Sequence, residues 1–296
     1  MPGILLERDR DPAPMRVTPE AAPSGEALAG TPALGRIGSL EVRLASSLNE
    51  IAAAQEIRYR VFYEEMGARS AEVDKLEARD ADRFDPICDH LLVFDTALDG
   101  PEHRQIVGTY RLLRQDVAEQ GFGFYSSDEF EIDKLVARHP RERFLELGRS
   151  CVLPEYRSKR TIEVLWHGIS AYIRRHSISV MTGCASFPGT IPAAHAEALS
   201  FIAQNLRPEP QWSISAVAGR YRTMDLVPPE AVDLRSAMAS MPPLIKGYLR
   251  IGARFGDGCV VDYDFGTTDI FVVLPVSTIS KRYVDYYKTG DIAVVI

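Results

Sequence analysis

The chain has 296 residues, of which 46% are apolar and 25% charged, the ordinary proportions of a folded globular protein. It contains no run of about 20 apolar residues and no basic-then-apolar start, which excludes a predicted membrane span and a secretory signal. The net charge of −7 excludes nucleic-acid binding by the chain as a whole. We therefore expect a cytoplasmic protein, and we also consider peripheral contact with the inner face of the membrane.

Residues 1–36 are rich in Pro, Ala and Gly without sustained apolar periodicity, which predicts a disordered leader. Beyond them, apolar residues recur at strand spacing in some stretches and at helical spacing in others. In chain order, the predicted elements are a strand at 40–46, a helix at 47–67, strands at 90–96 and 104–114, a short helix at 126–138, a strand at 144–153, a helix at 161–176, a strand at 179–187, a helix at 192–206, a strand at 213–226, a helix at 242–253 and a strand at 269–279. This order predicts an α/β fold (α+β) with a mixed central sheet flanked by helices.

The segment from Phe144 to Arg175 joins a strand, a basic turn and a helix. Unpaired backbone N–H groups and the helix dipole attract anions to the start of such a helix, and Arg157, Lys159 and Arg160 add positive charge. A merely polar loop would give the same pattern. The four cysteines lie far apart without zinc-site spacing, so no metal site is predicted.

Four segments occur in an order known from one group of enzymes: IRYRVFYEEMG, DRFDPICDHLLV, VGTYRLLR and LELGRSCVLPEYR. They resemble the acyl-homoserine lactone synthases and, more closely, the ornithine N-acyltransferases, both within the GNAT-like acyltransferase superfamily. The later segments PPLIKGYLRIGA and TTDIFVVLPV resemble the ornithine enzymes rather than the lactone synthases. The turn after Arg157 lacks both glycines of the usual GNAT motif, which argues against ordinary acetyl-CoA binding.

The resemblance implies a bacterial enzyme of ornithine-lipid synthesis. Such an enzyme moves a 3-hydroxyacyl chain from acyl carrier protein directly to the α-amine of L-ornithine, giving lyso-ornithine lipid. No separate cofactor is expected, because the phosphopantetheine arm arrives on the carrier. The resemblance divides the chain into the leader at 1–36, a GNAT-like core at 37–225, and a C-terminal extension at 226–296 that packs on the core and completes the fold.

The resemblance also assigns roles to individual residues. The substrate-binding positions are Arg58, Phe62, Asp82, Asp85, Arg111 and Arg149. Carboxylates suit a cationic amino acid, and an arginine suits its carboxylate. The residues expected to contact the carrier are Arg157, Ser158, Lys159, Arg160, Thr161 and Arg175.

Glu146 is the expected general base, acting on the amine directly or through a water. A backbone N–H near Ser150 or Cys151 would hold the oxyanion, and neither side chain needs to be a nucleophile. Strand alternation sends Glu146 and Arg149 to opposite faces, although a bulge at Gly148 would alter this and expose a backbone N–H.

Each assignment has a plainer alternative. Arg58 could pair with Glu64 or Glu65 on a helix surface. Asp82 and Asp85 could only cap turns. Glu146 and Arg149 could form a structural ion pair. An apolar slot for the acyl chain could instead be ordinary core; its candidate residues are Phe144, Val152, Trp166, Met181 and Phe187.

Two further segments and the function itself leave alternatives open. DYDFGTTD, from Asp262, looks like a calcium loop but lacks EF-hand spacing, and we predict a turn. PPLIKGYLRIGARF could lie at a membrane surface or pack on the sheet. The alternative functions are a lactone synthase or other N-acyl amino acid synthase, and a non-catalytic regulator that binds acyl carrier protein.

Overall fold

A computed structural model describes residues 32–69, 76–280 and 283 of the chain. One eight-stranded sheet runs through it in the order β1-β2-β3-β4-β5-β6-β8-β7. The strands are β1 (Gly35–Ile37), β2 (Leu40–Leu44), β3 (Asp89–Asp95), β4 (Ile106–Arg114), β5 (Phe144–Val152), β6 (Val180–Pro188), β7 (Arg254–Asp262) and β8 (Thr267–Pro275). All neighbours are antiparallel except β5 and β6, which are parallel. The sheet is therefore mixed, as the sequence predicted.

The helices follow the predicted order, with short additions. They are α1 (Leu48–Tyr59), α2 (Gln115–Ala118), α3 (Ile132–Arg138), α4 (Lys159–His176), α5 (Ala196–Asn205), α6 (Leu234–Ser240) and α7 (Pro243–Arg250). Ser47 caps α1, because its side chain accepts a hydrogen bond from the Glu50 N–H. A π-helical turn at Arg60–Glu65 continues α1, and Gly67 follows with a positive φ of 77°.

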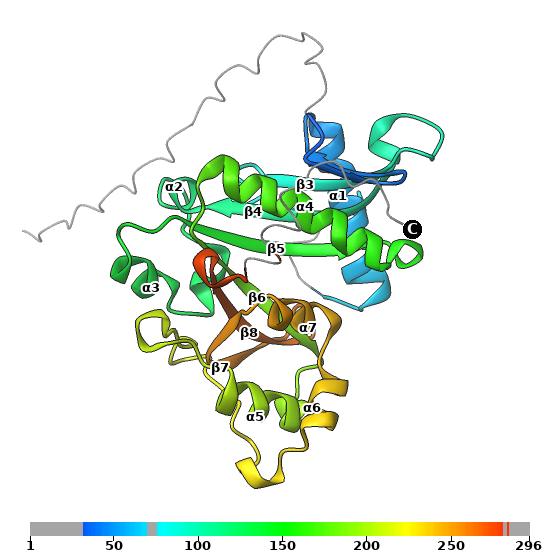
Figure 1. Cartoon of the computed structure of the whole chain (residues 1–296). Helices are drawn as coiled ribbons and strands as arrows, with labels where there is room; N and C mark the ends of the chain where they lie inside the picture. The colour runs from blue at the N-terminus through cyan, green and yellow to red at the C-terminus, as the bar shows by residue number, and fades with distance from the viewer. Residues whose placement is uncertain (1–31, 70–75, 281–282, 284–296) are drawn as a thin grey trace, which may run out of the picture.

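The helices cover both faces of the sheet. On the face toward the viewer in Figure 1, α4 crosses the strands; a Cβ on its Gly168 would lie 2.7 Å from Val42, so helix and sheet touch closely. On the same face the Tyr248 hydroxyl of α7 lies 2.7 Å from that of Tyr110 in β4. On the other face α1 packs on β4, while α3 joins a second apolar cluster around Phe144. Two apolar clusters thus hold the sheet: a larger one that includes buried residues of both α1 and α4, and a smaller one around Phe144.

Three expectations about the elements need correction. The leader predicted at 1–36 lies mainly outside the described residues, but Gly35–Ile37 forms the edge strand β1. The strand predicted at 213–226 is wrong, because a turn at Val217–Tyr221 breaks it into isolated bridges. β7 (Arg254–Asp262) was not predicted, because Gly256 and a register shift after Phe255 interrupt the apolar alternation.

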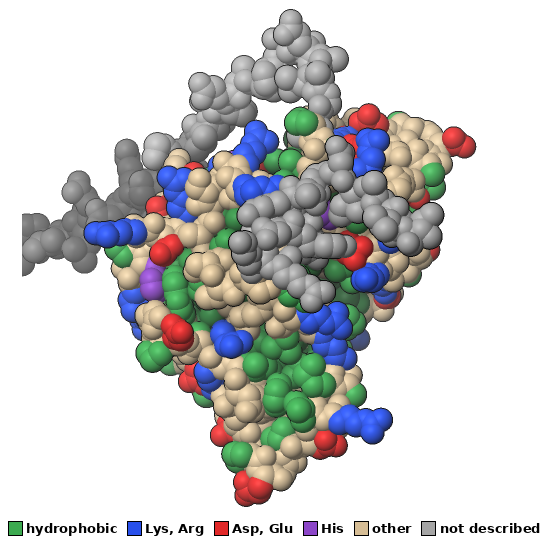
Figure 2. All heavy atoms as spheres, in the orientation of Figure 1, with side chains coloured by type: hydrophobic (Ala, Val, Ile, Leu, Met, Phe, Trp, Pro, Cys, Tyr) green, Lys and Arg blue, Asp and Glu red, His purple; other side chains and the backbone are tan. Residues whose placement is uncertain are grey.

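α7 packs on the sheet, which was the plainer interpretation of its segment. Its Ile245 and Tyr248 are buried, while Leu244 is 38% exposed. Figure 2 shows apolar side chains gathered on this side of the molecule, and Leu234 of α6 is 55% exposed. Within the described ranges, no helix has both the length and the apolar character needed to cross a bilayer.

Candidate active site

β5 and β6 run together only briefly and then part. Their parallel pairing covers three positions and ends where Glu146 faces Thr182. Beyond this point β5 pairs with β4, whereas β6 pairs with β8, and Figure 1 shows the two strands diverging. The resulting fork leaves edge backbone groups unpaired between neighbouring strands, which is where an extended ligand can bind.

Gly183 lies where the fork opens. Its φ is +154°, and a Cβ there would clash with the carbonyl oxygen of Leu147. Only glycine lets the two backbones approach this closely before they diverge. The sequence showed a glycine inside an apolar strand, a signal for close backbone approach that we did not use.

We expect Gly183→Ala to destabilise the protein by about 2 kcal/mol or more and to lower turnover, because the clash must shift one strand of the fork. Thermal unfolding and acyltransfer assays measure both effects. The matched control is Gly189→Ala, which also has a positive φ, of 92°, but has open space around the new Cβ. Equal losses in the two variants would show that backbone conformation, and not the contact with Leu147, sets the cost.

Glu146 is buried at the base of the fork. Its carboxylate accepts hydrogen bonds from the backbone N–H groups of Tyr125, at 2.7 Å, and Ser126, at 2.9 Å. Burial raises the pKa of Glu146, and these hydrogen bonds offset only part of the rise. A carboxyl group with a raised pKa, held in a fixed position beside an opening between strands, is suited to take a proton from an amine.

A β-bulge brings Arg149 to the same side as Glu146. The β4–β5 register shifts between Thr109 and Arg111, and Arg149 has a φ of +51°. Its guanidinium lies 4.7 Å from the ring centre of Tyr125, the residue whose N–H binds Glu146. The bulge thus overrides simple alternation, although the unusual backbone conformation falls on Arg149 and not on Gly148.

Arg58 is fully buried and binds two aspartates. Its Nη1 and Nη2 donate to the two carboxylate oxygens of Asp85, at 2.7 and 2.8 Å, and its Nε donates to Asp80 at 2.8 Å. The alternative pairing with Glu64 or Glu65 is wrong, because Arg58 faces inward. Asp80 was not predicted, although it stands in the same acidic run as the predicted aspartates.

Arg111 and Arg149 extend this network. Arg111 donates to Asp82 at 2.7 Å and to Asp85 at 3.3 Å. Arg149 donates to Asp82 at 3.3 Å and lies 3.3 Å from Asp80. Because each aspartate faces an arginine, we name Arg58, Arg111, Arg149, Asp80, Asp82 and Asp85 the arginine–aspartate network.

The arginines of the network keep Asp82 and Asp85 ionised, so these aspartates are poorly suited to accept a proton. Burial alone would raise the pKa of Asp82, but the charges of Arg111 and Arg149 outweigh it and hold the pKa below its usual range. Asp82 and Asp85 also cap a turn, accepting from the N–H groups of Phe84 and Asp82. Capping the turn is therefore only part of the role of these aspartates. Their ion pairs hold the arginine–aspartate network in a fixed arrangement along one side of the site.

Aromatic rings join this network to the β7–β8 turn. The Arg149 guanidinium lies 4.6 Å from the ring centre of Phe265, and Phe265 meets the predicted Phe62 edge-on at 5.8 Å. Phe62 thus reaches the network through Phe265. Neither Phe265 nor Tyr125 was predicted, because both lie outside the four sequence motifs.

The predicted carrier contacts fall into two places. At the start of α4, Lys159 and Arg160 are exposed, whereas Arg157 forms a two-pronged ion pair with Glu65, both contacts at 2.6 Å. Arg175 lies sixteen residues along α4, roughly 24 Å from Lys159 at 1.5 Å per residue. The structure therefore does not bring Arg175 together with the others.

Ser158 and Thr161 shape the helix start. Ser158 is the N-cap of α4 and accepts from the Thr161 N–H, while the buried Thr161 hydroxyl donates to the carbonyl of Tyr156. Both side chains are occupied within the protein, so the exposed positive charge of this surface comes from Arg160 and from Lys159, which lies 3.5 Å from Glu163.

Ser150 and Cys151 follow the bulge on β5. Burial raises the pKa of the Cys151 thiol to about 12, so the thiol is protonated at neutral pH and is a poor nucleophile. Ser150 is half-buried. Both backbone positions lie on the arm of the fork where the expected oxyanion donor would be.

The five residues proposed for an apolar slot do not form one surface. Phe144 belongs to the smaller apolar cluster, whereas Met181 and Phe187 belong to the larger one. These three are fully buried, and Val152 and Trp166 are only partly buried. The plainer interpretation as core therefore fits the set.

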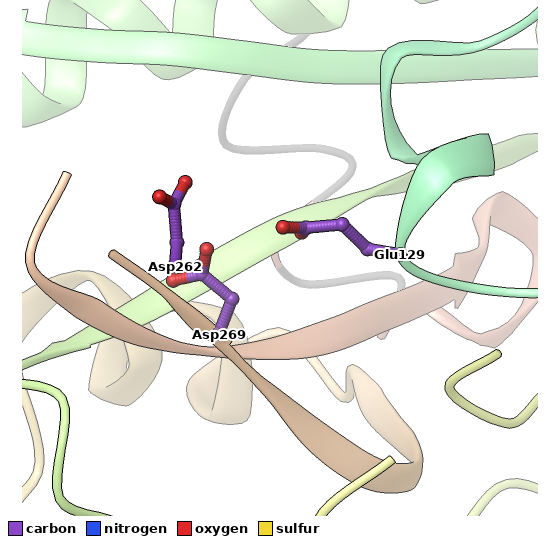
Figure 3. A group of neighbouring side chains, drawn as sticks. All are labelled: Glu129, Asp262 and Asp269. Atoms are coloured by element: carbon purple, nitrogen blue, oxygen red, sulfur yellow. The ribbon is translucent and has the colours of Figure 1, made fainter. Parts of the chain in front are cut away.

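A second cluster of carboxylates lies on the β6–β8 arm. Glu129, Asp262 and Asp269 converge, with one oxygen of each lying within 4.8 Å of the others (Figure 3). The segment that begins at Asp262 forms the predicted turn between β7 and β8, yet its two ends bring these aspartates together with Glu129. We name the three residues the acidic triad; they could hold a cation.

Comparison with known proteins identifies the family. Residues 57–167 match the family described as "Acetyltransferase (GNAT) domain". An L-ornithine N(alpha)-acyltransferase of Brucella abortus (strain 2308) is 62% identical over 254 residues, which cover 86% of this chain and 90% of that protein. The chain belongs to the L-ornithine N(alpha)-acyltransferase family. It is thus an acyltransferase, which argues against the non-catalytic regulator, and its sheet is the GNAT fold expected from the sequence.

More distant proteins are similar as well. A family member of Rhodobacter capsulatus is 38% identical over 250 residues, covering 84% of this chain and 95% of that protein. Among solved structures, FeeM, an N-acyl amino acid synthase from uncultured soil microbes, has a TM-score of 0.45 at 12% identity, covering 80% of this chain and 91% of that one. The acyl-homoserine lactone synthase BjaI has a TM-score of 0.47 at 13% identity, covering 83% and 86%.

Proposed function

We propose that this ornithine N-acyltransferase family member transfers a 3-hydroxyacyl chain from acyl carrier protein to the α-amine of L-ornithine, giving lyso-ornithine lipid. The observation that carries the proposal is the position of Glu146, buried at the base of the β5–β6 fork with its carboxylate held by two backbone N–H groups. The names of relatives at 38–62% identity support ornithine as the acceptor.

The fork suggests how the reaction proceeds. The thioester lies between the arms, and Glu146 takes a proton from the α-ammonium, directly or through a water. The amine nitrogen attacks the thioester carbon, and a backbone N–H near Ser150 or Cys151 stabilises the oxyanion. The C–S bond then breaks as the amide forms, and the leaving phosphopantetheine thiolate takes up the second proton, which the attacking nitrogen releases. A protonated Cys151 thiol is a poor nucleophile, which favours direct transfer.

The start of α4 suits the carrier. Acyl carrier protein is strongly acidic, and the exposed Lys159 and Arg160 stand beside the N-terminus of α4, whose dipole adds positive potential. The phosphopantetheine phosphate would meet the same surface, with Arg157, Ser158 and Thr161 fixing the turn. The lipid product has to leave toward a bilayer, and we place peripheral membrane contact at the apolar surface around Leu234 and Leu244.

The deciding experiment is amide formation by the purified protein with 3-hydroxyacyl carrier protein and each amino acid in turn. We expect N-acylornithine as the main product and a KM for the carrier that rises with salt, because surface charge attraction is screened. Parallel reactions use the same acyl chain on coenzyme A, and S-adenosylmethionine as acceptor. Turnover with coenzyme A alone would exclude the carrier, and release of a lactone from S-adenosylmethionine would assign the protein to the lactone synthases.

A further inference from the structure

The acidic triad crowds three carboxylates around one point. Glu129 and Asp269 are buried and Asp262 is half-buried, and Figure 3 shows the Glu129 side chain reaching toward the two aspartates. Burial, with the charge of Asp269 added, raises the pKa of Glu129 to about 7. Burial likewise raises the pKa of Asp269 to about 6. Three like charges held this close favour a bound cation.

Two polar groups at the triad lack partners within the described part of the chain. The Oδ1 atom of Asp269 has no hydrogen-bond partner, although the residue is only 6% exposed. The hydroxyl of Thr267, 4% exposed, lies near the Asp269 carboxylate but also has no partner of normal hydrogen-bond geometry. Strand alternation places Thr267 on the same face of β8 as Asp269, beside Asp262 across the β7–β8 pair. A buried oxygen without a partner is costly, so a donor is expected to fill this place.

The triad adjoins the reaction centre. The 3₁₀ turn Tyr125–Asp128 donates its first two N–H groups to Glu146, and Glu129 follows that turn directly. On the other side, Cys184 of β6 donates its thiol to Glu129 at 3.5 Å, two residues beyond the end of the β5–β6 pairing. The turn that binds Glu146 therefore leads directly into Glu129, and both residues lie next to the strands of the β5–β6 fork.

A pocket of about 330 Å³ opens beside the triad and is lined by Asp262, one of its three residues. Asp262 and two arginines line this pocket, and one of them, Arg220, lies 3.1 Å from Glu129. A pocket that places guanidinium groups beside a buried acidic cluster is complementary to a zwitterion that carries an additional positive charge. The bound guanidinium also disfavours a divalent metal ion, which it would repel twice as strongly as a singly charged ammonium.

We propose that the acidic triad binds the side-chain ammonium of the amino-acid acceptor and so selects a diamino acid. This inference rests on the proposed function for the identity of the acceptor, L-ornithine. Three carboxylates keep an amine protonated and therefore non-nucleophilic, which is the wrong state for the reacting nitrogen. The triad thus holds the distal amine inert, while the α-amine reaches the thioester beside Glu146.

The test compares L-ornithine with L-norvaline, which has the same carbon chain without the distal amine, using the full-length protein and saturating 3-hydroxyacyl carrier protein. We expect the wild type to prefer ornithine by roughly 10⁴-fold in kcat/KM. Asp269→Asn and Glu129→Gln should each raise the KM for ornithine about 10- to 100-fold, with little effect on norvaline or on the carrier. The matched control is Asp128→Asn, which removes a charge beside Glu129 from a side chain that is 77% exposed.

Calorimetric titration of ornithine without donor provides a second readout. Ornithine binding that depends on the triad, without amide formation, would support the inference and overturn the proposed function. Amide formation with an unchanged ornithine preference in both variants would support the proposed function and overturn the inference. Failure of the wild type to bind or acylate ornithine would overturn both, and activity that a chelator abolishes and Mg²⁺ or Ca²⁺ restores would make the triad a metal site.

Discussion

Arg58→Met lowers the free energy of unfolding by about 3–5 kcal/mol at neutral pH, because it removes the nearest guanidinium partner of the buried Asp80 and Asp85. Methionine fills much of the same volume, so the loss reports charge rather than a cavity. Urea unfolding of both proteins measures it. The control is Arg36→Met, which breaks an ion pair whose arginine side chain is 61% exposed and which should cost at most about 1 kcal/mol.

The stability difference between the wild type and Arg58→Met should become smaller as the pH falls. Burial alone would raise the pKa of Asp85, but the hydrogen-bonded Arg58 and the charge of Arg111 hold it well below its usual range. In the wild type this stabilisation is complete above the unfolded value of about 3.9 and is lost only as the pH falls through the lower folded value. Without Arg58 the folded pKa moves upward, so protonation near pH 5 relieves the variant. A deficit that is constant from neutral pH to about pH 5 would contradict this account.

Glu146→Gln should reduce kcat by roughly 10²-fold or more, the usual contribution of a general base. In the variant, the amide NH₂ would face one of the two backbone N–H groups that donate to the carboxylate in the wild type, so that hydrogen bond would be lost. We therefore also expect the free energy of unfolding to fall by about 1–3 kcal/mol. Thermal unfolding of both proteins measures this loss of stability separately from the loss of turnover. Glu155→Gln, on the exposed turn after β5, is the control for loss of a charge. Turnover close to wild type would remove Glu146 from this role.

The pH profile separates chemistry from structure. Because burial raises the pKa of Glu146, the wild-type rate should climb with pH through that raised value and then level off as the carboxylate becomes fully ionised. Glu146→Gln should lose this rising limb, whereas Glu146→Asp should keep it at a lower plateau. A limb that persists in the Gln variant would assign the titration to another group.

The sequence predicted those parts of the fold that local pattern determines. Ser47 could be identified as a cap because its partner is three residues away, and α4 showed a clear apolar face. β7 could not be identified, because its glycines and register shift remove the alternation on which strand prediction depends. The face of Arg149 likewise depends on a bulge whose presence local pattern does not determine.

The sequence likewise identified some residues of the candidate site but not others. The motif resemblance identified Arg58 and Asp85, which lie 27 residues apart yet form a paired contact. Spacing alone could not show that these charges neutralise one another, since that depends on how α1 packs on β4. Glu129 and Asp269 meet only because a turn beside β5 and the far strand β8 face the same opening, and no local pattern connects them.

The bulge at Arg149 has a thermodynamic consequence. A left-handed backbone conformation costs a side-chain-bearing residue about 1–2 kcal/mol relative to glycine, and Arg149 carries that cost at φ +51°. A glycine there would relax the strand, but it would also remove the cation that contacts Asp82, Tyr125 and Phe265. The protein thus accepts backbone strain at this one residue, and the strain fixes a positive charge beside Glu146 and beside the buried Asp80 and Asp82. Because loss of this cation would also remove a partner of the buried Asp80 and Asp82, variants selected for heat resistance should keep Arg149 despite its backbone strain.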